Sequence, residues 1–192
     1  MNRLPGPWLR FALILTLIGG GCAPAKLVGD VLPGSIAPDF TLTDGPTGEV
    51  VTLSSLRGSV VVLTFLYTRC PDVCPLTAET IRNARDRLGS SARKVAFLAV
   101  SVDPAGDTPN STRAFVGDHR LQQDLRYLIG SPSALARVWQ LYGIAQAVSA
   151  GDVLHSDVIY LIDKGQRGRI LLHSTVAPEV LAADLDILVN ER

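Results

Sequence analysis

Residues 60–75 read VVVLTFLYTRCPDVCP, in which an apolar run leads straight into two cysteines. The run over 60–67 is nearly continuous and rich in β-branched residues, which is typical of a strand buried on both faces. Residues 76–88 follow with apolar side chains near helical spacing, and a glycine ends them. We therefore expect Cys70 and Cys74 at a strand-to-helix junction, where free N–H groups and the helix dipole favour the thiolate form.

The rest of the chain continues this alternation between a first hairpin and a closing hairpin and helix. The expected strands are 40–43, 50–53, 95–102, 125–129, 157–162 and 169–172. The expected helices begin at Pro109, with Asp107 as the cap, and at Pro132, ending at Gly143, and the last runs over 178–190. This order predicts an α/β, thioredoxin-like fold, with a central mixed sheet flanked by helices and an extra N-terminal β-hairpin.

The N-terminus has the features of a signal peptide of the lipoprotein type. Two arginines precede an apolar run, 11–18, which is too short to span a bilayer, and small residues lead from it to Cys22. This junction resembles the lipobox of bacterial lipoproteins, in which the cysteine is acylated. The alternatives are an ordinary signal cleaved nearby and an uncleaved anchor. The predicted division is a signal peptide over 1–21, a lipid-anchored tether over 22–36 and one domain over 37–192.

Lipidation of Cys22 places the protein on the cell membrane, facing the extracytoplasmic side. It also accounts for the three cysteines, which become one anchor and one pair. The 18 basic and 18 acidic residues balance and form no basic stripe, so we expect no nucleic-acid partner. The length suits a single domain with a sizeable core, and we expect a monomer.

Two thiols at such a junction support thiol–disulfide exchange, capture of a soft metal, or a structural disulfide. Three residues separate Cys70 from Cys74, whereas thioredoxin-type reductases have two. A separation of about one turn puts both sulfurs on one face, which suits a shared metal ion. It still allows a disulfide, because Cα atoms roughly 4.4–6.8 Å apart can be bridged. The spacing alone therefore leaves the three alternatives open.

Three blocks of sequence, taken together, resemble the Sco family of copper-binding thioredoxin-fold proteins, which help to assemble the copper centre of cytochrome c oxidase. Residues 70–75 match the CPDxCP element of that family. Residues 103–109 match its DPxxDTP element, and His155 matches its late histidine before a strand. The resemblance covers about residues 35–190.

The resemblance implies that Cys70, Cys74 and His155 bind copper, as copper(I) and as copper(II). Soft thiolates suit copper(I), and imidazole suits both oxidation states. It also implies the copper-bearing subunit of a terminal oxidase as the partner. Asp72 and Asp103 are candidates for supporting contacts behind these ligands. Many relatives carry an aspartate just before the histidine, where this chain has Leu154.

Two function classes follow: a copper metallochaperone, and a thiol–disulfide oxidoreductase that keeps the oxidase cysteines reduced. Thioredoxins place a cis-proline opposite the cysteine pair, but this chain has no proline between Pro132 and Pro178. Its corresponding loop carries His155, which favours metal binding by analogy of fold. A thiol peroxidase fits poorly, because Thr-Arg-Cys replaces the expected Thr-x-x-Cys before the first cysteine. We expect His119 and His173 to be structural or surface residues.

Overall fold

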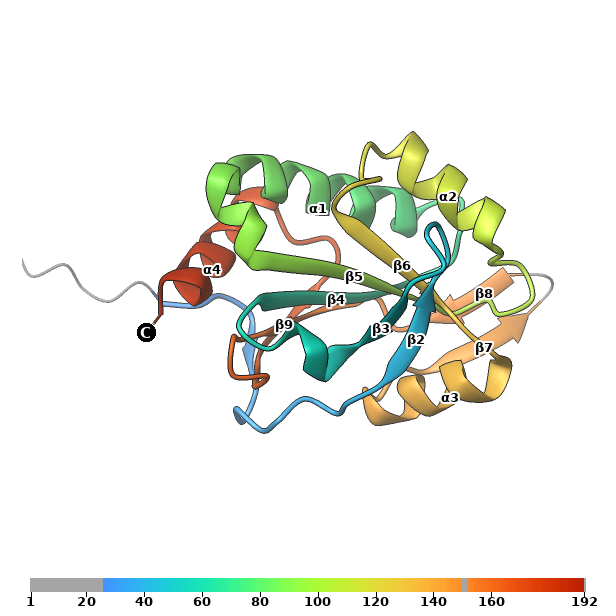
Figure 1. Cartoon of the computed structure of the whole chain (residues 1–192), viewed down its shortest axis with the longest axis horizontal. Coiled ribbons are helices and arrows are strands. Elements are labelled where there is room, and N and C mark those ends of the chain that lie inside the picture. Colours follow the sequence, from blue (N-terminus) through green and yellow to red (C-terminus); the bar gives the residue numbers. More distant parts are fainter. Residues whose placement is uncertain (1–25, 150–151, 192) are drawn as a thin grey trace, which may run out of the picture.

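The computed structural model describes residues 26–149 and 152–191, which form a mixed β-sheet with helices on both sides (Figure 1). The strands are β1 (Asp30–Val31), β2 (Thr41–Asp44), β3 (Val50–Thr52), β4 (Val60–Leu66), β5 (Val95–Ser101), β6 (Leu125–Ile129), β7 (Gln146–Ser149), β8 (Asp152–His155), β9 (Val158–Ile162) and β10 (Gly168–His173). The α-helices are α1 (Val73–Leu88), α2 (Pro109–Asp118), α3 (Pro132–Leu141) and α4 (Pro178–Asn190). Two short 3₁₀ helices are η1 (Leu53–Leu56) and η2 (Gly89–Lys94).

Eight of the strands form the main sheet, in the order β1-β10-β9-β4-β5-β6-β2-β3. Strands β4, β5 and β6 run parallel; β9 pairs antiparallel with the other side of β4, and β10 pairs antiparallel with β9. Every residue of β4 is buried, as its apolar run predicts. The predicted α/β architecture, a mixed sheet flanked by helices with an N-terminal β2–β3 hairpin, is confirmed.

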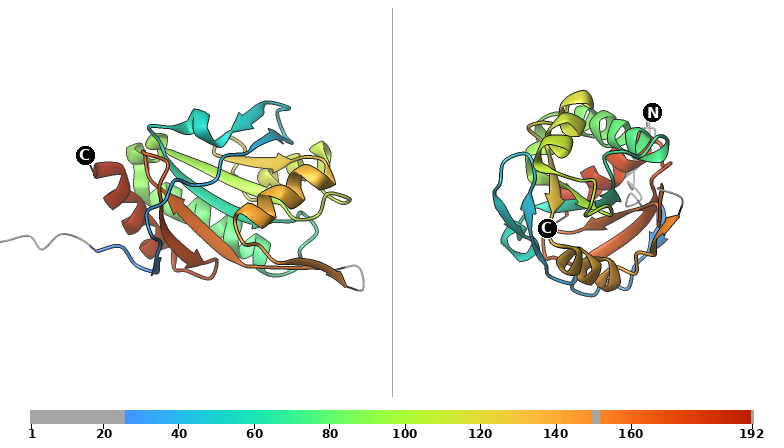
Figure 2. Two further views of the ribbon diagram at one scale, coloured as in Figure 1. Left: turned by 90° about the horizontal axis from the view of Figure 1, so that it is seen from below. Right: turned by 90° about the vertical axis from the view of Figure 1, so that its right-hand side faces the viewer.

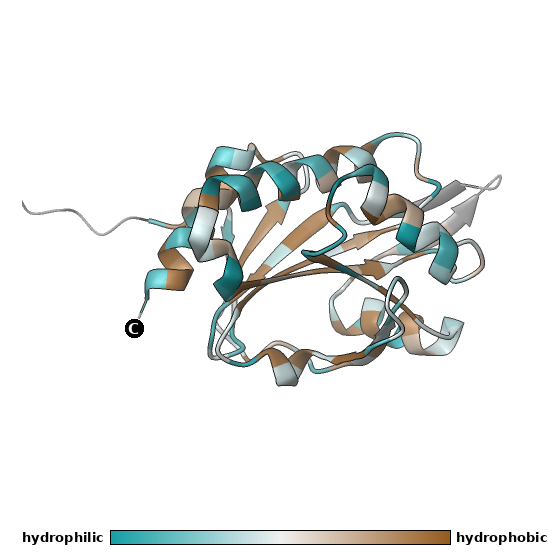
Figure 3. Ribbon diagram, turned by 45° about the horizontal axis from the view of Figure 1, so that its top comes forward, coloured by the Kyte–Doolittle hydropathy of each residue, from teal (hydrophilic) through white to brown (hydrophobic). Residues whose placement is uncertain are grey.

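The helices cover the two faces of the sheet unequally (Figures 1 and 2). Helices α1 and α4 lie side by side on one face, and α3 lies on the other. Colouring by hydropathy shows hydrophobic strands inside and hydrophilic outer surfaces on α1 and α2 (Figure 3). The core is therefore the apolar layer between sheet and helices, which holds the ends of the strands in fixed places.

Short sequence signals explain where two of the helices begin. Thr108 caps α2 through a reciprocal capping box with Ser111, and Pro109 occupies the first turn. Ser131 caps α3 by accepting a hydrogen bond from the backbone N–H of Ala134. The prediction that Asp107 caps α2 is therefore wrong, because its neighbour Thr108 fills that role.

The structure differs from the predicted elements in three further places. Helix α1 begins at Val73, so Cys74 lies inside its first turn rather than before it. Residues 146–149 and 152–155 pair as strands β7 and β8, which the sequence did not indicate. Part of the predicted tether, Asp30–Val31, pairs with β10 as an edge strand of the main sheet.

The predicted signal peptide, 1–21, and the predicted lipid site, Cys22, lie outside the described residues. Within the described part of the chain, no helix is both long enough and apolar enough to cross a membrane.

Candidate metal centre

The cysteine pair lies where β4 gives way to α1. Strands β4 and β5 are parallel, with Leu66 opposite Ser101, so the segments that follow both strands lie together at the carboxyl ends of these strands. Cys70 stands in the turn and Cys74 in the first turn of α1, and both side chains are buried. The backbone N–H of Cys74 donates to Sγ of Cys70 at 3.4 Å. The two thiols are free rather than joined in a disulfide.

His155, the last residue of β8, is the third predicted ligand. Its Nε2 lies 3.9 Å from Sγ of Cys74. Its Nδ1 lies 2.9 Å from the carbonyl oxygen of Ser156. Because a carbonyl only accepts hydrogen bonds, Nδ1–H is the donor in this contact, and Nε2 is the ring nitrogen that faces Cys74. The ring also packs edge-on against Tyr67, with centroids 5.8 Å apart. The β7–β8 hairpin thus brings a histidine from 81 residues along the chain to the cysteine pair.

Burial dominates the electrostatics of the second cysteine. Removal from water raises the pKa of the Cys74 thiol far above its ordinary value, and the hydrogen-bonding interaction with Cys70 raises it further. The sequence-based expectation that the helix N-terminus favours the thiolate is therefore wrong for Cys74 in the metal-free protein. Cys74 holds its proton, and a metal ion must displace that proton in order to bind.

The donor set suits a soft metal ion. Two sulfurs and one neutral imidazole nitrogen are ligands that copper(I) prefers, and a structural zinc site would need a fourth protein ligand. In the described ranges, 26–149 and 152–191, no three His, Cys, Asp or Glu side chains stand close enough together to form a ready-made metal site.

The other predicted residues lie at varied places. Asp72 is exposed at the N-cap position of α1, but its side chain makes no capping hydrogen bond. Asp103 is buried and pairs with Arg69, 2.7 Å away, a partner that sequence reasoning missed. His119 packs on Phe115, with ring centroids 4.6 Å apart, and His173 is exposed at the end of β10. These two histidines stand outside the predicted ligand set.

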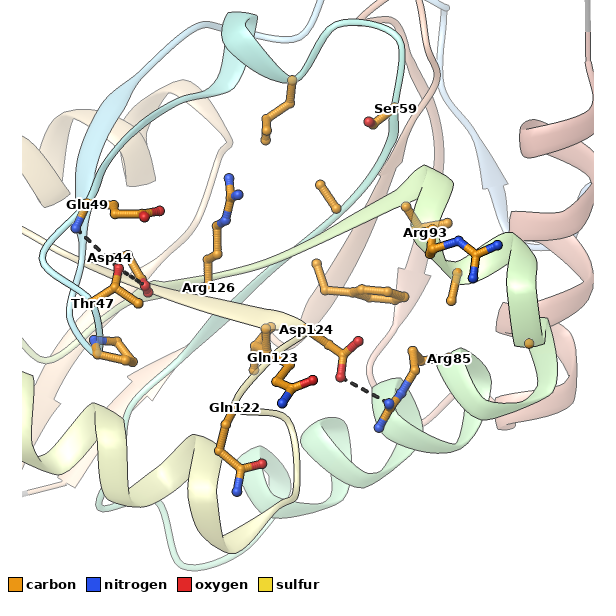
Figure 4. A pocket seen from close by; sticks show the side chains of 18 residues that line it. Asp44, Thr47, Glu49, Ser59, Arg85, Arg93, Gln122, Gln123, Asp124 and Arg126 are labelled. Atoms are coloured by element: carbon orange, nitrogen blue, oxygen red, sulfur yellow. Dashed lines mark hydrogen bonds and ion pairs between the residues drawn. The ribbon is translucent and has the colours of Figure 1, made fainter.

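A hollow of about 570 Å³ lies at the other end of the sheet, where β5 and β6 begin (Figure 4). Val95 at the start of β5 lines it, whereas the cysteines lie beyond the far end of that seven-residue strand, roughly 20 Å away. Arg85 and Asp124 pair inside it at 3.0 Å, and Arg93 and Arg126 lie around it. None of Cys70, Cys74 and His155 lines this hollow, so it is separate from the candidate metal centre.

Comparison with known proteins identifies the family of this chain. The chain is 32% identical over 181 residues to the mitochondrial SCO2 homologue of Bos taurus, a match that covers 82% of this chain and 67% of that protein. The structure of Bradyrhizobium japonicum ScoI with copper bound matches with a TM-score of 0.72 and 33% identity, covering 80% of this chain and 99% of that one.

A SCO1/SenC family lipoprotein from Bacillus anthracis shares the fold, with a TM-score of 0.74 at 22% identity, over 82% of this chain and 97% of that one. The model of the SCO1/SenC family matches residues 30–190, which is nearly all of the described chain. The chain therefore belongs to the SCO1/SenC family.

Proposed function

We propose that this protein is an extracytoplasmic copper metallochaperone, which binds copper through Cys70, Cys74 and His155. It would deliver the metal to the copper centre of a cytochrome c oxidase subunit. The observation that carries the proposal is the position of His155 Nε2, 3.9 Å from Sγ of Cys74 and beside a second free thiol. Family membership and the copper-bound structure of the Bradyrhizobium relative support it.

The same three donors suit both oxidation states of copper. Two thiolates satisfy copper(I) with few ligands, while copper(II) gains more from the imidazole nitrogen. The proposal includes a lipid anchor at Cys22, which would hold the protein on the outer side of the membrane. The lipoprotein character of the Bacillus anthracis relative is in keeping with that anchor. Asp72 and Asp103 would act only behind the ligands.

A second candidate function is thiol–disulfide exchange with the cysteines of the oxidase subunit. The specific observation in its favour is that both thiols are free and that the Cys74 N–H already reaches Cys70 Sγ at 3.4 Å. Exchange requires a free thiol pair in which one sulfur can reach the other, and this pair meets the first condition. The two functions are compatible, because copper binding requires the reduced pair.

Copper stoichiometry of the reduced protein tests the proposal. Wild type should bind one copper(I) per chain, and oxidation of the pair to a disulfide should abolish binding. The Cys70→Ser, Cys74→Ser double variant should bind none, whereas His173→Ala, which changes an exposed histidine outside the site, should bind like wild type. Stoichiometric copper(I) in the double variant would refute the ligand assignment. Normal reductase activity without any copper binding in wild type would favour the second function.

A further inference from the structure

The loop between β5 and α2 contacts Thr68 and Arg69, the two residues that precede Cys70. Arg69 Nη2 lies 2.7 Å from Asp103 Oδ2. The backbone N–H and the hydroxyl of Thr68 both donate to Asp107 Oδ1, each at 2.8 Å. One loop, residues 103–107, thus fixes the backbone and side chains on which the position of Cys70 depends.

The carboxylate of Asp107 is itself held from three segments. Its Oδ2 accepts hydrogen bonds from Ser101 Oγ at 2.6 Å, at the end of β5, and from Tyr127 OH at 3.1 Å, on β6. Asp107 is 6% exposed, while Ser101 and Tyr127 are fully buried. A buried carboxylate is costly unless donors surround it, and here four donors do so. Asp107 therefore ties the segment that follows β4 to the end of β5 and to the middle of β6.

Gly106 provides the space in which the ion pair between Arg69 and Asp103 forms. A Cβ atom on Gly106 would lie 2.2 Å from Asp103 Oδ2, and 2.6 and 2.7 Å from Arg69 Nη2 and Nε. The backbone N–H of Gly106 also donates to Asp103 Oδ1 at 2.9 Å. Any larger residue would thus push the Arg69 guanidinium away from the carboxylate. The requirement for glycine here is one of space around the ion pair.

We propose that residues 103–107 form a clamp that positions Cys70 against Cys74 and His155, with Gly106 and Asp107 as its positioning residues. The clamp reaches Cys70 through Thr68 and Arg69. This inference rests on the proposed function only where copper serves as the probe. Residues that orient the ligands of a metal site typically contribute about 10- to 100-fold to metal affinity.

Two variants loosen the clamp, and two matched variants control for them. Gly106→Ala displaces Arg69, and Asp107→Ala removes the acceptor for Thr68. Gly117→Ala adds the same methyl group on α2, where nothing lies within 4 Å of it. Asp184→Asn changes another buried aspartate, on α4, which accepts a hydrogen bond from the N–H of Val28.

The conservative variant Asp107→Asn completes the set. Its amide oxygen can still accept from Thr68, and the hydroxyls of Ser101 and Tyr127 can rotate to accept from its NH₂ group. It should therefore behave much like wild type, whereas Asp107→Ala should not.

The first measurement is copper(I) affinity, by competition with a chelator at a temperature at which each full-length variant is folded. Gly106→Ala and Asp107→Ala should lose about 10- to 100-fold, and the two control variants should stay near wild type. The second measurement uses the metal-free reduced protein: the rate at which iodoacetamide alkylates Cys70, resolved from Cys74 by mass spectrometry. That rate should rise in the two loosened variants, while the Cys74 rate changes little.

Copper affinity and Cys70 alkylation in Gly106→Ala and Asp107→Ala that match the Gly117→Ala and Asp184→Asn controls would overturn the clamp. An equal rise of both cysteine rates would do so as well, since it would indicate general loosening. Gly106→Ala keeps every hydrogen-bonding group, so it decides the question if Asp107→Ala does not fold. If wild type binds no copper, the proposed function fails, but the alkylation rates still decide whether the clamp exists.

Discussion

At the scale of single residues, the centre depends on which protons its donors carry. Cys74 holds its proton because burial raises the pKa of its thiol. The Nδ1–H of His155 donates to the Ser156 carbonyl oxygen, so in the proposed site Nε2 is the nitrogen that binds the metal. The imidazole is therefore prepared for a metal ion, whereas the thiol must first release a proton.

Copper affinity should therefore fall with pH. Below the raised pKa of Cys74, each copper bound displaces its proton, so the apparent affinity should drop about tenfold per pH unit for that proton. The dependence should continue above the ordinary thiol pKa of about 8.5, because the pKa of Cys74 lies higher. Chelator competition at several pH values measures this. A copper(I) affinity that is flat across the neutral range would contradict a protonated Cys74.

Replacement of His155 separates metal delivery from thiol exchange. In His155→Ala both cysteines remain, so the dithiol–disulfide couple should persist and some copper(I) should stay bound. Copper(II) affinity should fall at least about tenfold, together with the sulfur-to-copper(II) absorption band, because nitrogen contributes more to the copper(II) complex. Titration with absorption spectroscopy tests this, with His119→Ala as control. Wild-type binding of both copper states, with only reductase activity lost, would favour the oxidoreductase.

The sequence predicts these donors better than it predicts their environment. The family resemblance predicts Cys70, Cys74 and His155 as the copper ligands. The structure places Nε2 of His155 3.9 Å from Sγ of Cys74. The protonation of Cys74 could not be predicted, since its burial depends on elements far along the chain. Arg69 was missed for the same reason, because its partner Asp103 follows a different strand.

At the scale of elements, strong local signals predicted most boundaries. The fully buried β4 and the helix α4, whose bounds match the predicted 178–190, are examples. The β7–β8 hairpin was missed because its strands are four residues each and carry polar side chains at both ends. Strand β1 was missed because two residues pair only where β10 supplies the edge. Such elements depend on tertiary contacts that local pattern does not contain.

The cap of α2 gives an element-scale prediction. Thr108→Ala removes the side-chain acceptor for the N–H of Ser111 and leaves the reciprocal hydrogen bond, from the backbone N–H at position 108 to Ser111 Oγ, in place. The free energy of unfolding should fall by about 1 kcal/mol, as for other N-cap residues. Chemical denaturation measures this, and Thr175→Ala, in an exposed turn, is the control. Equal stability of the two variants would show that the cap contributes nothing.

At the scale of the whole molecule, the first described residues and the cysteine pair lie at opposite ends of the long axis. The chain enters at the end marked by the C-terminus of α4, whereas α1 begins at the other end, beside the β7–β8 hairpin (Figure 1). Seven residues separate Cys22 from Asp30 in β1, and the chain between these two positions can span at most about 28 Å. An anchor at Cys22 would therefore hold the domain near the membrane, with the cysteine pair at the end away from the tether.

The anchor itself is tested by Cys22→Ser, which should block acylation and change the protein from membrane-bound to released or uncleaved. A lipoprotein carries several acyl chains at its N-terminal cysteine, and more than one chain is needed for firm binding. The variant should therefore shift from the membrane fraction to the soluble fraction, or keep the mass of residues 1–21. Cys70→Ser is the matched control: it should lose copper but stay with the membrane, because it leaves the lipid site intact. Mass spectrometry of the wild-type N-terminus completes the test, and an unmodified N-terminus at a residue other than Cys22 would refute the anchor while leaving the copper site untouched.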